Sequence, residues 1–388
     1  MSHKSHFRRF LEADPERIHF AAHSHHLWPD VSFDAHARAW LDAARLVDQK
    51  WVAIFAEVIP RAQQHVARLL QLSDPQTIAF APNTHELVMR ILSCLPRTRT
   101  LRVLTTDSEF HSFARQAARL EEDGALDVTR IPAEPHASFT ERFALAASEP
   151  GWDLVYLSHV FYNSGYAVPE LARIALRVPE ETLVVIDGYH AFGAIPVDLS
   201  AVQDRVFYLA GGYKYAMSGE GCCFVHAPPR YGKRPRDTGW FAAFGALEDA
   251  QAPGAVAYAP SGARFLGATF DPSALYRFNA VMDWLEAERL TPAAIHAHVV
   301  RLQELFVEEL GPRYLPLRED QLVVPLAEKS RGQFLTFENS AANELHARLL
   351  EANVVTDVRG NRLRFGFAIY HDETDIHRGV ERISRSLT

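Results

Sequence analysis

The chain is poor in cysteine and methionine. Of its 388 residues, three are Cys and four are Met. Cys222 and Cys223 are neighbours, and their Cα atoms lie about 3.8 Å apart, which is closer than an unstrained disulfide normally allows. Together with Cys94 they are therefore expected to be free, mostly buried thiols.

Several other features are missing, and each absence removes a class of function. No apolar stretch approaches the roughly 18 residues of a membrane span, and the N-terminus MSHKSHFRRF lacks the apolar core of a signal peptide. We therefore expect a cytoplasmic protein with no membrane partner. The net charge of -8 leaves no basic footprint for nucleic acid. The nucleotide loops GxGxxG and GxxxxGK[ST] are both absent.

What remains is an ordinary globular composition with an informative central stretch. With 48% hydrophobic residues, the chain has material for two or three domains of about 150 residues each. Residues 183–186 form an apolar run typical of a buried strand, and Asp187 ends it. A second apolar run, 206–210, leads through a Gly-Gly turn to Lys214. In an open α/β sheet, ligands bind beyond the carboxyl ends of such strands.

A carboxylate and an amine in that position suit pyridoxal phosphate (PLP) chemistry. Lys214 would hold the cofactor as a Schiff base, and Asp187 would pair with the pyridinium nitrogen so that the ring accepts electrons. The alternative is a surface lysine in a Gly-rich turn and an aspartate that merely caps a strand.

The runs IDGYHAFGAIPVDL and GGYKYAMSGEG resemble the cofactor-binding core of the class V aminotransferase superfamily, in particular its kynureninase-like branch. The resemblance implies PLP-dependent fold type I. It identifies Lys214 as the cofactor lysine, Tyr213 as a phosphate or acid/base partner, and His190 as a support for Asp187.

The same resemblance assigns further cofactor contacts. A helix N-terminus with free amide groups can bind phosphate, and the turn holding Asn83, Thr84 and His85 opens a helix where the family docks the cofactor phosphate. Phe110 would cover one face of the cofactor ring, although it could equally pack in the core. Asn163 would reach the phenolic oxygen.

Substrate contacts are implied in two segments. Ser24 is what remains of an Asn-Ser-Leu-Gly segment that lines the substrate pocket in kynureninase-like enzymes, and His25 follows it. In NVVTDVRGNRLRFGFAIYHDETDI, Arg364 matches the arginine that clamps the substrate carboxylate. Arg359 and Arg362 could instead be structural partners of Asp357.

The expected architecture is α/β. A large PLP-binding domain with a mostly parallel, doubly wound sheet would span residues 30–273, and a smaller α+β domain residues 274–388. Residues 1–29 would form an arm that contributes to the smaller domain and the active site. The segments 239–241 and 264–269 resemble those by which one subunit reaches its partner's cofactor phosphate, through Trp240 and Thr269. The resemblance therefore implies a homodimer with shared active sites.

The predicted function is a PLP-dependent enzyme acting on an α-amino acid, with kynureninase-like hydrolytic or eliminative cleavage at Cβ. The histidines around Ser24, and Val88 where some kynureninases carry histidine, argue against ordinary kynurenine recognition. A cysteine desulfurase is disfavoured because no Cys follows Cys223.

Three alternatives stay open at this level. The first is a class V aminotransferase. The second is a non-catalytic protein that keeps the fold, against which the intact pair of Asp187 and Lys214 speaks. The third is a metal hydrolase using His23, His25 and His26; no metal is predicted, because no fourth ligand is evident nearby.

Overall fold

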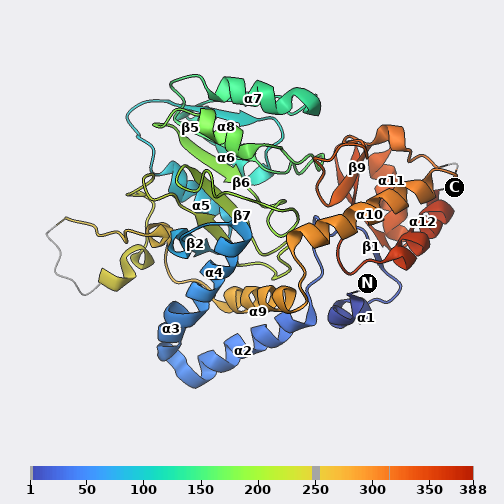
Figure 1. Ribbon diagram of the computed structural model, residues 1–388, viewed down its shortest axis with the longest axis horizontal. Helices are drawn as coiled ribbons and strands as arrows, with labels where there is room; N and C mark the ends of the chain where they lie inside the picture. The colour runs from blue at the N-terminus through green and yellow to red at the C-terminus, as the bar shows by residue number, and fades with distance from the viewer. Residues whose placement is uncertain (1–2, 247–253, 314, 388) are drawn as a thin grey trace.

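A seven-stranded sheet forms the centre of the larger part of the molecule (Figure 1). The structure is a computed structural model and describes residues 3–246, 254–313 and 315–387. The strand order is β2-β8-β7-β6-β5-β3-β4, with strands β2 (Ile78–Ala81), β3 (Leu101–Thr106), β4 (Leu126–Ile131), β5 (Leu154–Ser158), β6 (Leu183–Asp187), β7 (Val206–Gly211) and β8 (Cys223–His226). Neighbours pair in parallel except for β8, which is antiparallel to both β2 and β7. The predicted α/β fold with a mostly parallel sheet is confirmed.

Both faces of this sheet are buried, which explains the continuous apolar runs of its strands. Val184 and Ile186 of β6 face one core, whereas Val185 between them faces the other. Alternate side chains of a strand point to opposite faces, so a strand covered on both sides carries no polar stripe. The sheet is therefore sandwiched between helical layers.

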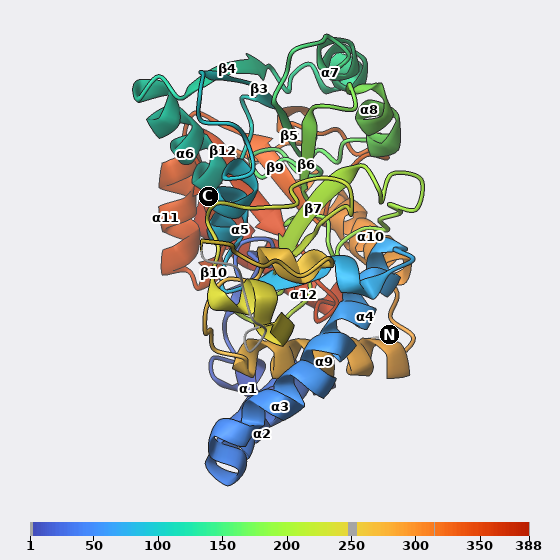
Figure 2. The same ribbon diagram turned by 90° about the vertical axis from the view of Figure 1, so that its left-hand side faces the viewer.

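Helices from separate parts of the chain cover the two faces. One core includes residues of α4, α7, α8 and α9, and the other includes residues of α5 and α6. The helix bounds are α1 (Arg8–Glu12), α2 (Asp30–Leu46), α3 (Lys50–Ala53), α4 (Ile59–Leu70), α5 (Thr84–Leu92), α6 (His111–Glu122), α7 (Phe139–Ala147), α8 (Leu171–Arg177), α9 (Ser273–Ala287), α10 (Pro292–Leu310), α11 (Ala342–Glu351) and α12 (Glu373–Leu387). Helices α2, α3 and α4 follow one another along the chain, and Figure 1 shows a sharp bend between α2 and α3, which Figure 2 draws at the far end of the molecule from α7.

A smaller antiparallel sheet lies beside the large one. It has the order β11-β12-β9, formed by β11 (Asp357–Arg359), β12 (Arg362–Gly366) and β9 (Phe334–Glu338). Helices α10, α11 and α12 surround it (Figure 1). These strands and helices therefore form a second layer with its own hydrophobic core.

The N-terminal arm joins this smaller core. Strand β1 (Ile18–His19) pairs in parallel with β10 (Val354–Val355), and Ile18 and Phe20 pack among C-terminal apolar residues. Helix α9, in contrast, packs against α2 and α4 and shares the core of the large sheet. The domain boundary near residue 273 stays a prediction.

The cysteines and the apolar helices bear on two further expectations, which were free thiols and no membrane span. The three cysteines are free, with Cys222 and Cys223 buried and Cys94 half-buried, as predicted. Within residues 3–246, 254–313 and 315–387, no helix combines the length and apolar character needed to cross a bilayer.

Candidate active site

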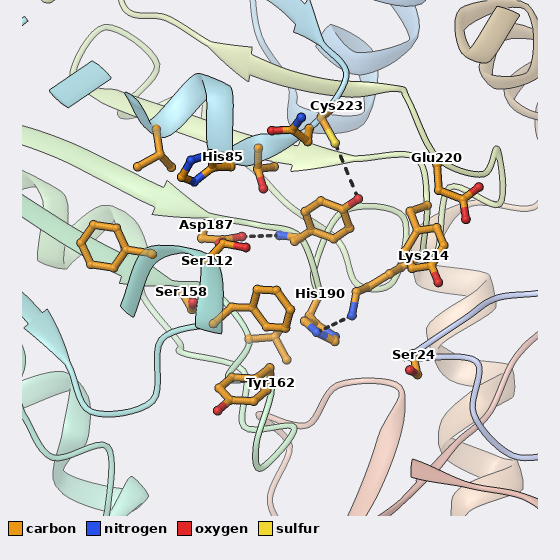
Figure 3. Close-up of a pocket in the computed structure, with 18 of the residues that line it drawn as sticks. Ser24, His85, Ser112, Ser158, Tyr162, Asp187, His190, Lys214, Glu220 and Cys223 are labelled. Carbon is orange, nitrogen blue, oxygen red and sulfur yellow. Dashed lines mark hydrogen bonds between the residues drawn. The ribbon is translucent and has the colours of Figure 1, made fainter. Parts of the chain in front are cut away.

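A cavity of about 510 Å³ opens where the carboxyl ends of β3, β5 and β6 meet (Figure 3). The chain runs from β5 to β6 to β7 on one side of this point and from β3 to β4 on the other, so the order of the strands reverses here. Such a reversal separates the connecting loops and leaves a crevice. Its size is within the usual range of small-molecule sites.

Asp187 projects into the cavity from the end of β6. The backbone N–H of Tyr189 donates to Oδ1 at 2.9 Å, and the hydroxyl of Tyr156 donates to Oδ2 at 3.0 Å. Burial raises the pKa of Asp187, while the two hydrogen bonds and the Lys214 amine act in the opposite direction. The carboxylate is thus held in one orientation at the wall of the cavity.

Lys214 reaches the same cavity from the turn that follows β7. An added Cβ would lie 1.9 Å from Oγ of Ser218 at position 212 and 2.6 Å from Sγ of Cys223 at position 211, so the two glycines leave room for the side chains packed against this turn. The Nζ atom donates to the carbonyl oxygen of His23 at 2.8 Å and lies 2.8 Å from Nε2 of His190. Burial, together with the nearby Arg364 cation, lowers the pKa of Lys214 to about 7.

The lowered pKa of Lys214 has a chemical consequence. An ordinary lysine, with a pKa of about 10.4, is almost wholly protonated at neutral pH, whereas Lys214 offers a substantial fraction of free amine. The free amine is the form that attacks a carbonyl carbon or takes a proton. His190 is itself neutral there, because burial and Lys214 hold its pKa well below the ordinary histidine range.

Helix α5 points its N-terminus at the far end of the cavity. Asn83 is the N-cap, and its side chain accepts from the backbone N–H of Glu86 at 2.9 Å. Thr84 and His85, in the first turn, line the cavity with Ser112 of α6. Unpaired N–H groups at helix N-termini bind phosphate readily.

Two aromatic rings flank the lysine. Its Nζ lies 5.8 Å from the ring centre of Phe110 and 5.9 Å from that of Tyr189. Phe110 is 37% exposed and lines the cavity, so it is not a core residue. A flat ligand could therefore stack against it.

Arg364 of β12 lines the side of the cavity formed by the smaller sheet. Its Nη2 donates to Oδ2 of Asp357, and its Nη1 donates to the carbonyl oxygen of Tyr162. The Nε atom is buried and has no partner among the residues that the structure describes. Burial lowers the pKa of Arg364, but a guanidinium keeps its charge at physiological pH. At least one N–H of this buried cation is thus left without a hydrogen-bond partner in the described part of the chain.

The neighbouring arginines have separate partners. Nη1 of Arg359 donates to Oδ1 of Asp357 at 2.8 Å, as expected for a structural pair. Arg362 instead donates to Glu134 at 2.5 Å and to Glu338 at 3.3 Å. Arg362 therefore pairs with these two glutamates and not with Asp357.

Most of the predicted site residues line one cavity, and four do not. Those that do are Ser24, Asn83, Thr84, His85, Phe110, Asp187, His190, Tyr213, Lys214 and Arg364. Asn163 donates to Ser108 at 3.1 Å. His25 packs between the rings of Trp28 and Tyr213. Trp240 and Thr269 are exposed and lie outside the lining.

The three clustered histidines do not converge on a common point. His23 stacks on Phe334, whereas the ring of His26 lies beside Tyr370 and its Nδ1 contacts the carbonyl oxygen of Leu27 at 2.7 Å. Among the described residues, the side chains that bring three potential metal ligands within 4.8 Å are His3, His6 and Glu288, outside the cavity lining. This arrangement gives no support to a metal hydrolase built on His23, His25 and His26.

The sequence did not single out two acidic residues of the site. Glu109 lies buried beside Phe110 and accepts from the hydroxyl of Ser158 at 2.5 Å and that of Thr106 at 2.6 Å. Burial raises the pKa of Glu109 to about 7. Glu220 lines the mouth of the cavity. The one local signal for Glu109 is its position three residues after the end of β3, and nothing local distinguishes Glu220.

Comparison with known proteins agrees with this geometry. Kynureninase from Deinococcus radiodurans is 27% identical over 362 residues, which are 90% of this chain and 82% of that protein. Kynureninase from Pseudomonas fluorescens is 30% identical over 242 residues, or 60% and 56% of the two chains. Isopenicillin N epimerase from Streptomyces clavuligerus is 28% identical over 174 residues, or 44% and 43%.

Solved structures of PLP enzymes share the fold. A mutant of C-DES with glycine covalently linked to its PLP cofactor superimposes with a TM-score of 0.81 at 17% identity, over 97% of this chain and 98% of that one. Cysteine desulfurase from Thermococcus onnurineus gives a TM-score of 0.81 at 16% identity, over 100% and 98%. The model of the class V aminotransferase family matches residues 48–378. The chain therefore belongs to the class V aminotransferase family, whose members adopt PLP-dependent fold type I.

Proposed function

We propose that this chain is a PLP-dependent enzyme that cleaves an α-amino acid at Cβ in a kynureninase-like reaction, on a substrate other than kynurenine. The observation that carries the proposal is the meeting of Lys214, Asp187 and Arg364 in one cavity. An amine of lowered pKa, a fixed carboxylate and a buried guanidinium with a free N–H are the groups such chemistry needs.

The residues present fit the cofactor. The N-terminus of α5, with Thr84 and His85, would hold the phosphate, and Phe110 would cover one face of the ring. Asp187 would face the ring nitrogen, and Lys214 would be the covalent attachment point. When bound, the cofactor supplies an electron-withdrawing ring that stabilises negative charge at the substrate Cα.

The side chains around the cofactor would divide the remaining work. Arg364 binds the substrate carboxylate through its free Nε–H, which fixes the orientation of Cα. Nζ of Lys214 would take the α-proton, and His190, whose Nε2 lies 2.8 Å from Nζ, would help to orient this amine. Phe110, which lines the cavity, would shield one face of the bound ring from water.

The choice of reaction rests on positions where this sequence differs from the pattern of related enzymes and on the similar proteins named above. Two of the relatives named above are kynureninases. The solved neighbours include cysteine desulfurases, but no Cys follows Cys223 in this chain, so a persulfide-forming cysteine in the smaller sheet is absent from the sequence. Val88 lines the cavity at a position where, by the resemblance, some kynureninases carry histidine, which directs the proposal toward another substrate side chain.

Product analysis tests the proposal. The purified protein is loaded with PLP and given L-kynurenine, other amino acids with a carbonyl group at the γ-carbon, L-alanine and L-aspartate. We expect a visible cofactor band and release of alanine from a γ-carbonyl amino acid, because hydrolytic cleavage at Cβ leaves alanine. Pyruvate and ammonia would indicate elimination. Conversion to the pyridoxamine form alone would identify an aminotransferase, and a protein that stays colourless with PLP would overturn the proposal.

We further propose that the active enzyme is a homodimer with shared active sites. Trp240, 48% exposed, and Thr269 lie outside the cavity of their own chain, which is consistent with a role in a partner's site. We expect light scattering to give twice the monomer mass. We also expect Trp240→Ala to weaken PLP binding severalfold, because the indole would help to enclose the partner's phosphate end. A monomeric, fully active protein would contradict this arrangement.

A further inference from the structure

His23 is fully buried, yet its ring lacks hydrogen bonds. Its side chain is 0% exposed, and neither Nδ1 nor Nε2 has a hydrogen-bond partner among the described residues. Buried polar groups in folded proteins are nearly always paired, and leaving one unpaired costs free energy. An imidazole kept in such a position needs a reason.

The smaller sheet is shaped to hold this ring. The imidazole stacks on Phe334 of β9, with ring centres 4.5 Å apart and an interplanar angle of 20°. Phe334 pairs in register with Gly366 of β12. A Cβ at position 366 would lie 2.2 Å from Nδ1 of His23, so only glycine leaves room for the ring. The position of the imidazole is therefore fixed by two neighbouring strands.

This position places the imidazole beside the arginine anchor. Nε2 of His23 lies 3.6 Å from Oδ2 of Asp357, which is too long for a hydrogen bond. The same Oδ2 already accepts from Nη2 of Arg364. Burial, with the cations of Arg364 and Lys214 nearby, holds the pKa of His23 well below the ordinary range. The ring is thus neutral, with one N–H to donate.

We propose that His23 is a positioning residue that acts on the substrate carboxylate through Asp357. Once a carboxylate binds Arg364, His23 donates its Nε2–H to Oδ2 of Asp357. The inference rests on the proposed function. A carboxylate bound bidentately to a guanidinium uses two parallel N–H groups, and Nε of Arg364 is the unoccupied donor. Nη2 has two N–H groups, so it then donates one to the substrate and the other to Asp357, and the attraction between Asp357 and the guanidinium charge weakens because that charge is shared with a second carboxylate.

His23 is suited to compensate for that loss. Because Nε2 is less than 1 Å beyond a normal hydrogen-bond length from Oδ2, a small shift of either side chain closes the gap. Asp357 would keep its charge fully hydrogen-bonded, with Nη1 of Arg359 on its other oxygen. The backbone carbonyl of His23 also accepts from Lys214, so one residue contacts both the amine and the carboxylate-binding groups.

The experiment compares two ligands that differ only in the α-carboxylate. Dissociation constants of L-alanine and ethylamine are measured from changes in the visible spectrum of the PLP-loaded protein, for wild type, His23→Phe and His23→Gln. Phe keeps the stacking on Phe334 but has no donor, whereas the amide nitrogen of Gln can occupy the place of Nε2. For His23→Phe we expect L-alanine to bind about tenfold more weakly and ethylamine within about twofold of wild type, since one hydrogen bond to a charged group is lost. His23→Gln should restore most of the affinity for L-alanine.

Other binding results would overturn the inference, and one spectral result would overturn the proposed function as well. Equal weakening of both ligands in His23→Phe would show a merely structural role and overturn the inference, as would unchanged binding of L-alanine. Thermal unfolding of the three proteins without PLP checks that they fold, and His23→Leu gives the same comparison with a smaller side chain. A missing visible band in all variants would overturn the proposed function itself and the inference with it.

Discussion

Replacement of Lys214 by alanine is expected to lower turnover by at least about 10³-fold, since the group that would attach the cofactor and move the α-proton is lost. The protein should still fold, because Lys214 lies at a cavity wall and its two polar contacts are with His190 and a backbone carbonyl. Borohydride treatment should fix PLP covalently to the wild-type protein and not to the variant. Mass spectrometry of the treated proteins and steady-state kinetics measure both effects.

Lys214→Arg is the matched control for this experiment. Arginine keeps the positive charge and can still donate to the carbonyl of His23, but a guanidinium stays protonated and is a poor nucleophile. We therefore expect the arginine variant to be as inactive as the alanine variant. It should bind phosphate-bearing ligands at least as tightly as the alanine variant does. A rate close to wild type in either variant would remove Lys214 from the chemistry.

Asp187→Asn is expected to lower turnover by about 10²- to 10³-fold, as found for other fixed electrostatic groups in active sites. The substitution is nearly isosteric. The amide oxygen can still accept from the N–H of Tyr189, and the amide nitrogen can donate to the hydroxyl of Tyr156. The shape of the site is thus kept and only the negative charge is lost. Without it, a proton on the pyridine nitrogen is no longer stabilised.

Asp153→Asn serves as the comparison for Asp187→Asn. Asp153 precedes β5, at the opposite end of the sheet from the cavity, and pairs with Arg99 at 2.5 Å. We expect its substitution to reduce stability modestly and to leave kcat near the wild-type value. The kinetics should be read with the visible spectrum, because the loss of the charge at 187 should also shift the cofactor band. Equal activity of Asp187→Asn and wild type would contradict the role of this carboxylate.

Much of the large sheet could be predicted from local pattern. The apolar runs 183–186 and 206–210 became β6 and β7, and α5 begins at the turn that was expected to open a helix, with Asn83 as its N-cap. These features depend on neighbours in the chain: a strand buried on both faces needs an unbroken apolar run, and an N-cap needs one short polar side chain. The meeting of Asp187 and Lys214 also follows locally, because both residues come just after adjacent parallel strands.

The carboxylate-binding side of the site could not be predicted in the same way. Arg364 was recognised by resemblance, but its contacts with Asp357 and the carbonyl of Tyr162 depend on how the smaller sheet sits against the large one. Similarly, the buried pair formed by Glu109 and Ser158 joins segments about 50 residues apart in sequence. No periodicity in either segment encodes that distance.

The sequence by itself determined the buried strands at residues 183–186 and 206–210 and the polar residues that follow them, since these come from the burial of consecutive side chains, while the fold type was implied by the resemblance of its motifs to class V aminotransferases. Only the tertiary structure decided which buried polar atoms have partners. His23 illustrates the difference: its place beside Asp357 requires the arm, β9 and the glycine of β12 to pack together. Hydrogen bonding in a buried site depends on separations of less than 1 Å between distant segments, and such separations are set by packing rather than by sequence pattern.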